Sequence, residues 1–269
     1  MERRYIFDVA VLDLPTNRYE VVRGVVPAEV LDHVRGFLER EVESTVAPIL
    51  AEMGLEDSDA LRDRIANGDV TETDYAGLSD EARKAVTGHF RLEARLSPVL
   101  HDIPRSAPVL DLLRKVLRSE QVHMHLPPVA RYVFPGNRLA GVPAHRDAAY
   151  NAHMTDFVTM WVPLVPIDGE CGGVRFFPDL DPLSLESVEQ DPDRPWLSPL
   201  DTGSLDGIHH PMSPGDVVLF DKNVVHQSAA NSSTRTRLSI DFRFFGGGDS
   251  STKPHLDLAT GEAVHPARP

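Results

Sequence analysis

Cysteine, net positive charge and long apolar runs are all scarce in this sequence, and each scarcity argues against a class of protein. The 269 residues include one cysteine, Cys171, which rules out an internal disulfide framework and suits a reducing compartment. The formal net charge of -14 disfavours a nucleic-acid or anionic-membrane surface, because either partner needs a basic face. No apolar stretch reaches the roughly 18 residues of a membrane span, and the start lacks the apolar region of a secretion signal. We therefore expect a cytoplasmic protein that binds neither nucleic acid nor membrane.

The sequence also lacks the surroundings that would make His145-Arg146-Asp147 the catalytic loop of a protein kinase. In a kinase the metal-binding asparagine follows the aspartate of this loop by about five residues, and an Asp-Phe-Gly motif comes later. Here Asn151 comes one residue too early, no Asp-Phe-Gly follows, and no glycine-rich loop precedes it. A kinase is disfavoured, and His145 and Asp147 need another explanation.

The apolar residues that are present suggest helices first and strands later. With 41% apolar residues the chain can bury a sizeable core, and we interpret residues 1–269 as one domain. Residues 5–12 are expected to be a short strand. The stretch that begins at residue 19 is expected to run from a short strand through Gly24 into a helix. Apolar residues then recur at helical spacing within 30–42 and 109–117, so residues 1–120 are expected to be largely helical.

One stretch of this first part is unusually acidic. Residues 54–82 contain nine acidic and two basic residues and few large apolar side chains. Such a composition predicts a solvated excursion of helix and loop, or a flexible lid.

After residue 120 the sequence changes to short β-rich runs separated by proline, glycine and aspartate, the pattern of a sandwich or barrel. Strands are expected near residues 122–126, 130–134, 157–165, 174–177, 216–220 and 237–245. We interpret residues 121–248 as the β core. A long insert at 179–207 interrupts it, and a loosely docked tail at 249–269 follows it.

Two histidines and one aspartate of this β-rich part are candidates for a metal centre. His145 and Asp147 are two residues apart, so on an extended segment both side chains point to one side. His226 follows an apolar strand and is placed to complete a two-histidine, one-carboxylate face. Such a triad leaves positions open for oxygen and an organic co-substrate, as in non-haem Fe(II) oxygenases. A second pair of this spacing, His255 and Asp257, is interpreted as part of the tail.

The segment after His226 predicts a strand with two unlike faces. Alternate side chains give a polar face and an apolar face, which are Arg237, Ser239, Asp241 and Arg243 against Leu238, Ile240, Phe242 and Phe244. In one interpretation the polar face meets water. In the other it lines a barrel cavity while the N-terminal helices cover the apolar face. The second arrangement needs a resident anion, because an unpaired buried charge is costly.

A dicarboxylic co-substrate is an anion of the right kind for that second arrangement. A guanidinium grips a carboxylate through two parallel N–H bonds, and a hydroxyl two residues along can add a third. Arg237 and Ser239 have this spacing. Arg235 is the rival anchor, but it lies nearer the preceding loop, and we favour Arg237.

These motifs, in this order, resemble the phytanoyl-CoA dioxygenase-like (PhyH) family of Fe(II)/2-oxoglutarate-dependent oxygenases. The resemblance spans roughly residues 19–244 and is strongest from residue 131 onward. It rests on His145-x-Asp147, Trp161-Val-Pro-Leu, Gly172-Gly173, Gly-Asp-Val-Val-Leu-Phe, His226-Gln-Ser-x-x-Asn231 and an arginine eleven residues after His226.

The resemblance implies a fold and a site. The fold is mainly β with α, a double-stranded β-helix or jelly roll flanked by N-terminal helices. His145, Asp147 and His226 would hold Fe(II), and Arg237, helped by Ser239, would pair with the distal carboxylate of 2-oxoglutarate. The third reactant would be O2.

The resemblance also implies an activity, although not a substrate. Members convert 2-oxoglutarate to succinate and usually hydroxylate an unactivated C–H bond, and desaturation or ring closure are related outcomes. Halogenating relatives lack a carboxylate at the position of Asp147, so halogenation is disfavoured. Where many relatives have Pro-Gly-Ser-His, this chain has Pro178-Asp179-Leu180-Asp181, and nothing in it indicates a CoA site. We expect a small-molecule metabolite, such as an amino acid derivative or a natural-product intermediate.

Several further residues are candidates for substrate contact, each with a structural alternative. They are Arg131, Tyr150, Asn151, Asp241 and Arg243. The alternatives are a surface role for Arg131, loop solvation for Tyr150 and Asn151, and a salt bridge between Asp241 and Arg243. For the whole chain, the alternatives are a jelly-roll metalloenzyme that does not use 2-oxoglutarate and a binding protein that does no chemistry. The sequence does not predict the oligomeric state.

Overall fold

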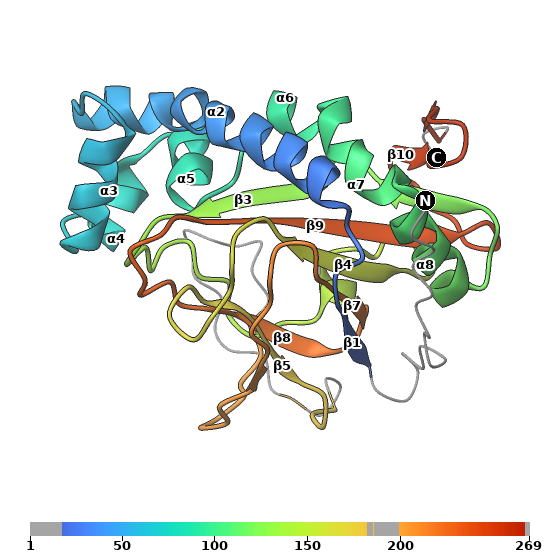
Figure 1. The fold of residues 1–269 in the computed structure, drawn as a ribbon. Helices are drawn as coiled ribbons and strands as arrows, with labels where there is room; N and C mark the ends of the chain where they lie inside the picture. Colours follow the sequence, from blue (N-terminus) through green and yellow to red (C-terminus); the bar gives the residue numbers. More distant parts are fainter. Residues whose placement is uncertain (1–17, 182–184, 186–198, 267–269) are drawn as a thin grey trace.

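Two antiparallel sheets and a layer of helices make up the protein (Figure 1). The computed structural model describes residues 18–181, 185 and 199–266. The larger sheet has the order β1-β7-β4-β9-β2-β10-β11, with β3 also paired to β9, and the smaller sheet has the order β6-β5-β8. The strands are β1 (Tyr19–Val22), β2 (Val122–His125), β3 (Val129–Val133), β4 (Val158–Pro163), β5 (Gly173–Phe177), β6 (Ile208–His209), β7 (Val217–Asp221), β8 (Val225–Ala229), β9 (Arg237–Gly246), β10 (His255–Asp257) and β11 (Ala263–Val264).

The helices precede most of the strands in the chain and cover one face of the larger sheet (Figure 1). They are α2 (Ala28–Met53), α3 (Ser58–Ala66), α4 (Glu72–Gly77), α5 (Asp80–Val86), α6 (Leu92–Arg95), α7 (Asp102–Arg105) and α8 (Ala107–Leu117), with short 3₁₀ turns η1 (Pro98–His101) and η2 (Asp147–Ala149). Helix α2 ends at Gly54, whose φ of 64° lies in the left-handed region that closes many helices.

The two faces of β9 are divided as in the second arrangement that the sequence left open. Its apolar residues share one buried cluster with apolar residues of α2, so they pack under the helices. Its polar residues point to the other side, between the two sheets. Figure 1 shows β3 and β9 directly beneath the helical layer and β5 and β8 on the far side.

A second apolar cluster lies between the two sheets. Trp161 of β4 and Phe220 of β7 meet Phe176 of β5 there, and Cys171 is buried among them as a free thiol. The larger sheet is therefore covered on both faces, by helices on one and by the smaller sheet on the other. This is the helix-flanked jelly roll that the resemblance implies.

The glycine pair at the start of β5, Gly172 and Gly173, lets the smaller sheet form tightly. Gly172 has a φ of +82°, and a Cβ atom there would lie 2.6 Å from the carbonyl oxygens of both Ala229 and Ala230. Any other residue would push β5 away from β8, because side chains rarely adopt this conformation and the backbone leaves no room.

Most of the predicted elements are confirmed within one or two residues of their bounds. The strands expected near 122–126, 130–134, 157–165, 174–177, 216–220 and 237–245 correspond to β2, β3, β4, β5, β7 and β9. The short strand expected between residue 19 and Gly24 is β1. The helical stripes at 30–42 and 109–117 lie in α2 and α8. The strand expected at 5–12 and most of the insert at 179–207 lie outside the described residues.

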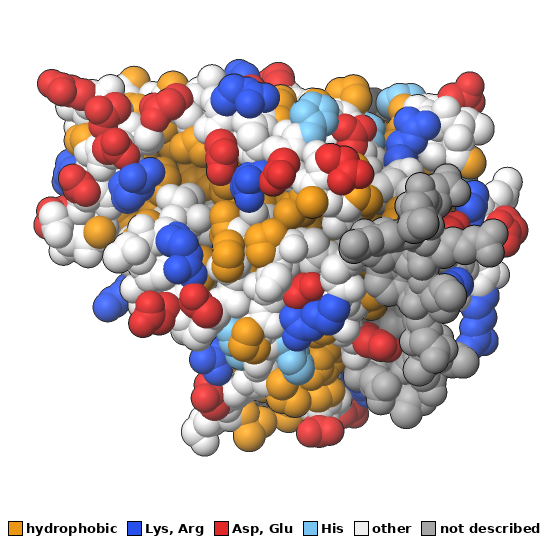
Figure 2. All heavy atoms as spheres, viewed as in Figure 1, with side chains coloured by type: hydrophobic (Ala, Val, Ile, Leu, Met, Phe, Trp, Pro, Cys, Tyr) orange, Lys and Arg blue, Asp and Glu red, His pale blue; other side chains and the backbone are white. Residues whose placement is uncertain are grey.

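The acidic stretch at residues 54–82 contains helices and loops, and most of its residues are exposed, as predicted for a solvated excursion. Its helices nevertheless dock on the core. Helices α3, α4 and the start of α5 occupy this stretch, and Leu61, Ile65 and Tyr75 are buried in the main apolar cluster. The average composition concealed these few well-placed apolar contacts. In Figure 2 acidic and basic side chains are interspersed over the helical layer.

The prediction of a loosely docked tail is wrong for its described part. Strand β10 pairs with β2, so His255 lies opposite His125 and Asp257 lies opposite His123. Leu256 is buried in the main cluster. The tail therefore extends the larger sheet at one edge. Within the described residues, no helix is both long enough and apolar enough to cross a membrane.

Candidate metal centre

A pair of backbone hydrogen bonds brings the two histidines of the expected triad together. The amide of His145 donates to the carbonyl of His226, and the amide of His226 donates back, both at 2.9 Å. Residues that exchange both bonds lie directly opposite each other in an antiparallel pair. Two positions that are 81 residues apart in the sequence (226 minus 145) therefore face each other, with ring centroids 4.2 Å apart.

Each imidazole is oriented by the carbonyl of a residue two positions earlier. His145 Nδ1 lies 2.8 Å from the Pro143 carbonyl, and His226 Nδ1 lies 3.0 Å from the Val224 carbonyl. A carbonyl only accepts, so each Nδ1 carries the proton and each Nε2 keeps its lone pair for a ligand. Metal-binding histidines are commonly held in this way.

The free ring nitrogens meet the carboxylate of Asp147. Its Oδ1 lies 3.7 Å from His145 Nε2 and 3.9 Å from His226 Nε2. One ligand atom from each of the three residues lies within 4.8 Å of the other two, and all three residues are buried. Among the described residues this is the cluster of histidine, cysteine and carboxylate groups that could hold a metal ion.

Two neighbours hold the carboxylate of Asp147 in place. Thr159 Oγ1 of β4 donates to Oδ2 at 2.5 Å, and Arg243 Nη2 of β9 donates to Oδ1 at 3.2 Å. The side-chain amide of Asn151 donates to the Asp147 carbonyl at 2.9 Å and so fixes the backbone at the start of η2. The aspartate is therefore held from three different segments.

The protonation states suit metal binding. Burial would raise the pKa of Asp147, but Arg243 and the two imidazoles hold this pKa well below its usual range. Burial, together with the neighbouring His145, lowers the pKa of His226 to about 3. The aspartate is thus charged and His226 is neutral near neutral pH, the forms in which both can bind a cation.

The donor set fits iron. Two neutral imidazole nitrogens and one carboxylate oxygen on one side of a point form the facial triad of non-haem Fe(II) oxygenases, which leaves the opposite positions open. A structural zinc site would use four protein ligands and close the coordination sphere. The described residues offer three, so an open site is the better match.

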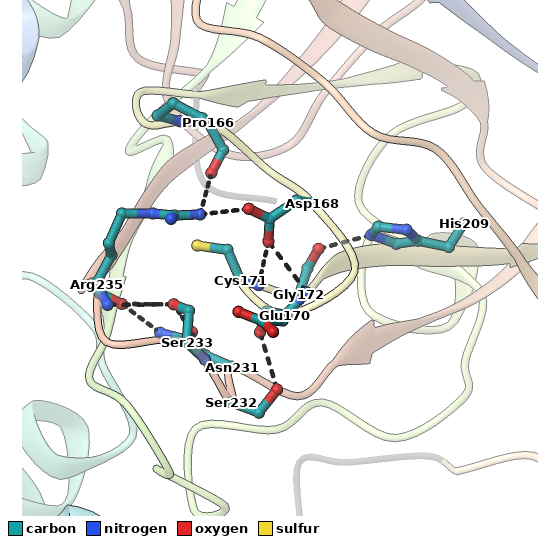
Figure 3. A network of polar contacts seen from close by, with 10 residues as sticks. All are labelled: Pro166, Asp168, Glu170, Cys171, Gly172, His209, Asn231, Ser232, Ser233 and Arg235. Atoms are coloured by element: carbon teal, nitrogen blue, oxygen red, sulfur yellow. Dashed lines mark hydrogen bonds and ion pairs between the residues drawn. The ribbon is translucent and has the colours of Figure 1, made fainter.

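The two candidate anchors for the co-substrate lie in different surroundings. Arg235 comes before β9 begins, its side chain is 44% exposed, and it forms an ion pair with Asp168 at 2.7 Å. Figure 3 shows that its guanidinium also points to the Pro166 carbonyl. Its charge is already compensated at the surface. Arg235 therefore has no need of an internal anion.

Arg237, by contrast, lies inside the barrel. It is 3% exposed, and Nη1 donates to the Ala229 carbonyl at 3.1 Å while Nε is buried without a partner. Burial, and then the charge of Arg131, lowers its pKa to about 10, so it stays charged at neutral pH. No ion pair joins Arg237 to a described carboxylate. A buried, charged and only partly bonded guanidinium is what a carboxylate ligand requires.

Ser239 and Arg131 stand beside this anchor. Both are buried, and they face each other across the β3–β9 pair. The Ser239 hydroxyl has no hydrogen-bond partner within the described parts of the chain. Arg131 donates to the carbonyls of Thr87 and Ala140 and keeps a buried, unpartnered Nε. The alternative of a surface role for Arg131 is wrong.

The remaining candidates are two residues of β9, Asp241 and Arg243, and two residues that follow Asp147 in the chain, Tyr150 and Asn151. Asp241 lies on the inner face of β9 and has no hydrogen-bond partner among the described residues, so the alternative of a salt bridge with Arg243 is wrong. Arg243 pairs with Asp147 instead. Tyr150 is half-buried with its ring 5.2 Å from that of His145, and so borders the triad. Asn151 is buried and supports the backbone of Asp147, so loop solvation is the wrong interpretation for it.

Thr159, which contacts Asp147 of the triad, is a residue that the sequence did not single out. Threonine is a common strand residue, and within 157–165 it differs little from any β-branched residue. The usable signal was alternation: Thr159 shares a face with Trp161, and that face turns to the inside of the barrel.

The chain matches a known family along most of its length. A sequence model described as phytanoyl-CoA dioxygenase (PhyH) matches residues 19–239. The fold is similar to that of EvdO2 from Micromonospora carbonacea var. aurantiaca, solved with 2-oxoglutarate, at 15% identity and a TM-score of 0.59, covering 88% of this chain and 89% of that one.

Two further solved structures have the same fold. EctD from S. alaskensis, solved with 2-oxoglutarate and 5-hydroxyectoine, has 19% identity and a TM-score of 0.56 and covers 87% of this chain and 74% of that one. SnoN, described as a non-heme alpha ketoglutarate dependent epimerase from nogalamycin biosynthesis, has 17% identity and a TM-score of 0.51, covering 88% and 80%.

The family match covers well over half of the chain, and the donor set that the fold assembles is the one an iron oxygenase needs. The chain therefore belongs to the phytanoyl-CoA dioxygenase (PhyH) family and is an oxygenase-type enzyme that depends on iron, 2-oxoglutarate and O2.

Proposed function

We propose that this enzyme hydroxylates a small-molecule metabolite, with His145, Asp147 and His226 as the iron ligands. Arg237, helped by Ser239, binds the distal carboxylate of 2-oxoglutarate. One observation carries the proposal: the free Nε2 atoms of two oriented imidazoles and a carboxylate oxygen converge within 4.8 Å. Lone pairs gathered in this way repel one another unless a cation lies between them, and burial strengthens that repulsion.

The chain's own groups have distinct tasks in this reaction. When bound, iron with 2-oxoglutarate and O2 supplies the oxidising power that attacks an unactivated C–H bond. Thr159 and Arg243 orient the Asp147 carboxylate, and Arg237 fixes the far end of the co-substrate. The apolar wall around Trp161 and Phe176 excludes water from the co-substrate side.

The substrate is proposed to be a small metabolite, such as an amino acid derivative or a natural-product intermediate. EctD was solved with 5-hydroxyectoine, and SnoN comes from nogalamycin biosynthesis. Both names support a small organic substrate for this fold. Hydroxylation is the proposed outcome, and desaturation or cyclisation at the same carbon would follow from the same residues. The buried, unpaired Cys171 supports a cytoplasmic location.

The proposal is tested by iron binding and by succinate formation in the same preparations. Wild-type protein should bind about one Fe(II) per chain and convert 2-oxoglutarate to succinate in the presence of O2. His226→Ala should weaken iron binding by more than the roughly 10- to 100-fold that loss of an outer partner costs. His209→Ala is the matched control, because His209 bonds the Gly172 carbonyl and lies outside the triad.

Equal iron content in the wild type and His226→Ala would contradict the ligand assignment. Iron binding without succinate in any condition would contradict the proposed use of 2-oxoglutarate by this site. Mass analysis of the product then separates hydroxylation, which adds one oxygen, from desaturation or cyclisation, which removes two hydrogens.

A further inference from the structure

Beyond the anchor, the inner face of β9 continues into a group of polar side chains. Apart from Arg243, which orients Asp147, these side chains have no task in the proposed reaction. Asp241 and Arg243 follow Ser239 on this face. His125 ends β2, and His153 lies in the loop after η2, with the two ring centroids 4.6 Å apart. Arg243 acts electrostatically on both imidazoles. We call Asp241, Arg243, His125 and His153 the polar wall.

The polar wall holds several hydrogen-bonding groups without partners. His125 Nε2, His153 Nε2 and Arg243 Nε are all buried and unpartnered. The Asp241 carboxylate, inside the barrel, accepts no hydrogen bond from any described residue. Buried polar atoms are nearly always satisfied in folded proteins, so unpaired groups gathered in one place indicate a missing ligand.

The donor or acceptor character of these groups limits the chemical class of ligand that can bind them. Burial lowers the pKa of His125 to about 3, so its ring is neutral, and its unpartnered Nε2 can accept a hydrogen bond. The Asp241 carboxylate is an acceptor as well. Arg243 Nε is a donor, and His153 Nε2 can be either. A hydroxyl group, which both donates and accepts, can satisfy donors and acceptors of this kind together.

The charges around the polar wall disfavour both kinds of ion. An ammonium group would meet Arg243 and Lys253, the cations that act on His153. A second carboxylate would meet Asp147 and Asp241, and Nη2 of Arg243 is already bonded to Asp147. A neutral polar group avoids both repulsions.

We propose that the polar wall is a substrate subsite for neutral, adjacent hydroxyl groups, such as the diol of a sugar or a cyclitol. The inference rests on the proposed function, because Arg243 of the wall also contacts the metal ligand Asp147, which places a bound diol beside the iron. Rotation of His125 or His153 about its terminal side-chain torsion, which is soft, turns Nε2 toward such a ligand.

The test uses three probes that share a six-membered carbon ring: cyclohexane-1,2-diol, cyclohexylamine and cyclohexanecarboxylate. Dissociation constants are measured by NMR titration of the full chain, both metal-free and loaded with Zn(II) and 2-oxoglutarate, which do not react with O2. The diol should bind tightest in both states. Asp241→Asn and His125→Phe should each weaken the diol by about tenfold, the effect of losing one hydrogen bond to a strong partner.

His123→Phe is the matched control. His123 lies two residues before His125 on the same face of β2, but its ring stacks on Phe245 and meets His255 instead of Arg243. It should leave diol binding unchanged. Thermal melts of all variants establish that the fold is retained.

A preference for the amine or the carboxylate, or equal binding of all three probes, overturns the subsite. So does diol binding that is the same in Asp241→Asn, His125→Phe and the wild type. Failure of the proposed function has a different signature, since Zn(II) and 2-oxoglutarate would then not bind while the diol preference of the metal-free protein remained.

Discussion

The two faces of strand β9 are both largely buried, but they lie against different surroundings. The apolar face packs against helices of the same chain, and that contact covers its side chains. The polar face looks into the barrel, where Arg237 and Arg243 keep unpartnered Nε atoms and Asp241 has no described hydrogen-bond partner. The side chains of the apolar face find all their contacts within the chain, whereas the polar groups of the other face need bound ligands to satisfy their hydrogen bonds. The difference predicts that changes on the apolar face act on stability and changes around the polar face act on binding.

The largest expected effect is a loss of stability when a side chain on the apolar face of β9 is removed. Phe242 is fully buried among the helices, so Phe242→Ala should lower the free energy of unfolding by about 3 to 5 kcal/mol. Chemical denaturation monitored by circular dichroism measures this loss. The protein that remains folded should still bind iron, because Phe242 points away from the triad. A stable Phe242→Ala variant that had lost iron binding would reverse the assignment of the two faces.

A change beside the polar face should act on the metal and spare the fold. Thr159→Val keeps the shape of the side chain but removes the donor to Asp147 Oδ2. Iron affinity should fall by about 10- to 100-fold, as when an outer partner of a ligand is lost. Thr159→Ser retains the hydroxyl and is the control. Competition against a chelator measures both, and equal affinities for the two variants would contradict the orienting role of this hydroxyl.

A third change should have a smaller effect on stability, and in the opposite direction. Removing the charge of Asp241 on the polar face should stabilise the protein, whereas Phe242→Ala on the apolar face should destabilise it. Burial raises the pKa of Asp241 to about 6 from 3.8, although Arg243 opposes this rise. Between these two values the folded state holds more protons than the unfolded state, so this carboxylate makes the protein less stable as the pH rises. Asp241→Asn removes that loss and should stabilise the metal-free protein above pH 6 by on the order of 3 kcal/mol.

The pH dependence is the control for this prediction. The advantage of Asp241→Asn should shrink as the pH falls through the same range and vanish near the unfolded-state pKa of 3.8, below which Asp241 is protonated in both states. Unfolding midpoints measured across that range test it. An advantage that grew on acidification would mean that Asp241 is stabilised as a carboxylate and is already paired.

The sequence was sufficient to propose the triad and the strand that carries the anchor. The spacing of His145 and Asp147 and the alternation along β9 are local patterns. They depend only on nearby residues of the chain, so they can be recognised without knowing the fold. The sequence favoured Arg237 over Arg235 as the proposed anchor, and the structure adds the surroundings of each. Alternation puts both on one face, but Arg235 precedes the strand, so the rule of alternation does not extend to it.

The parts that the sequence missed depend on contacts between distant segments. Helix α3 has an acidic composition, yet Leu61 and Ile65 are enough to dock it on the core. Strand β10 is three residues long and is held by β2, which lies far earlier in the chain. A short polar segment alone does not reveal that α3 packs on the core or that β10 pairs with β2.

The most direct measurement of the central claim is calorimetric titration of 2-oxoglutarate into metal-loaded, oxygen-free protein. Arg237→Gln should bind 2-oxoglutarate more weakly by at least about tenfold, because a charge-assisted hydrogen bond contributes about 1.5 to 3 kcal/mol. Arg235→Gln should bind it like the wild type, since an exposed ion pair contributes about 1 kcal/mol or less, and only to the surface loop. Equal affinity in the wild type and Arg237→Gln, or a loss confined to Arg235→Gln, would contradict the account.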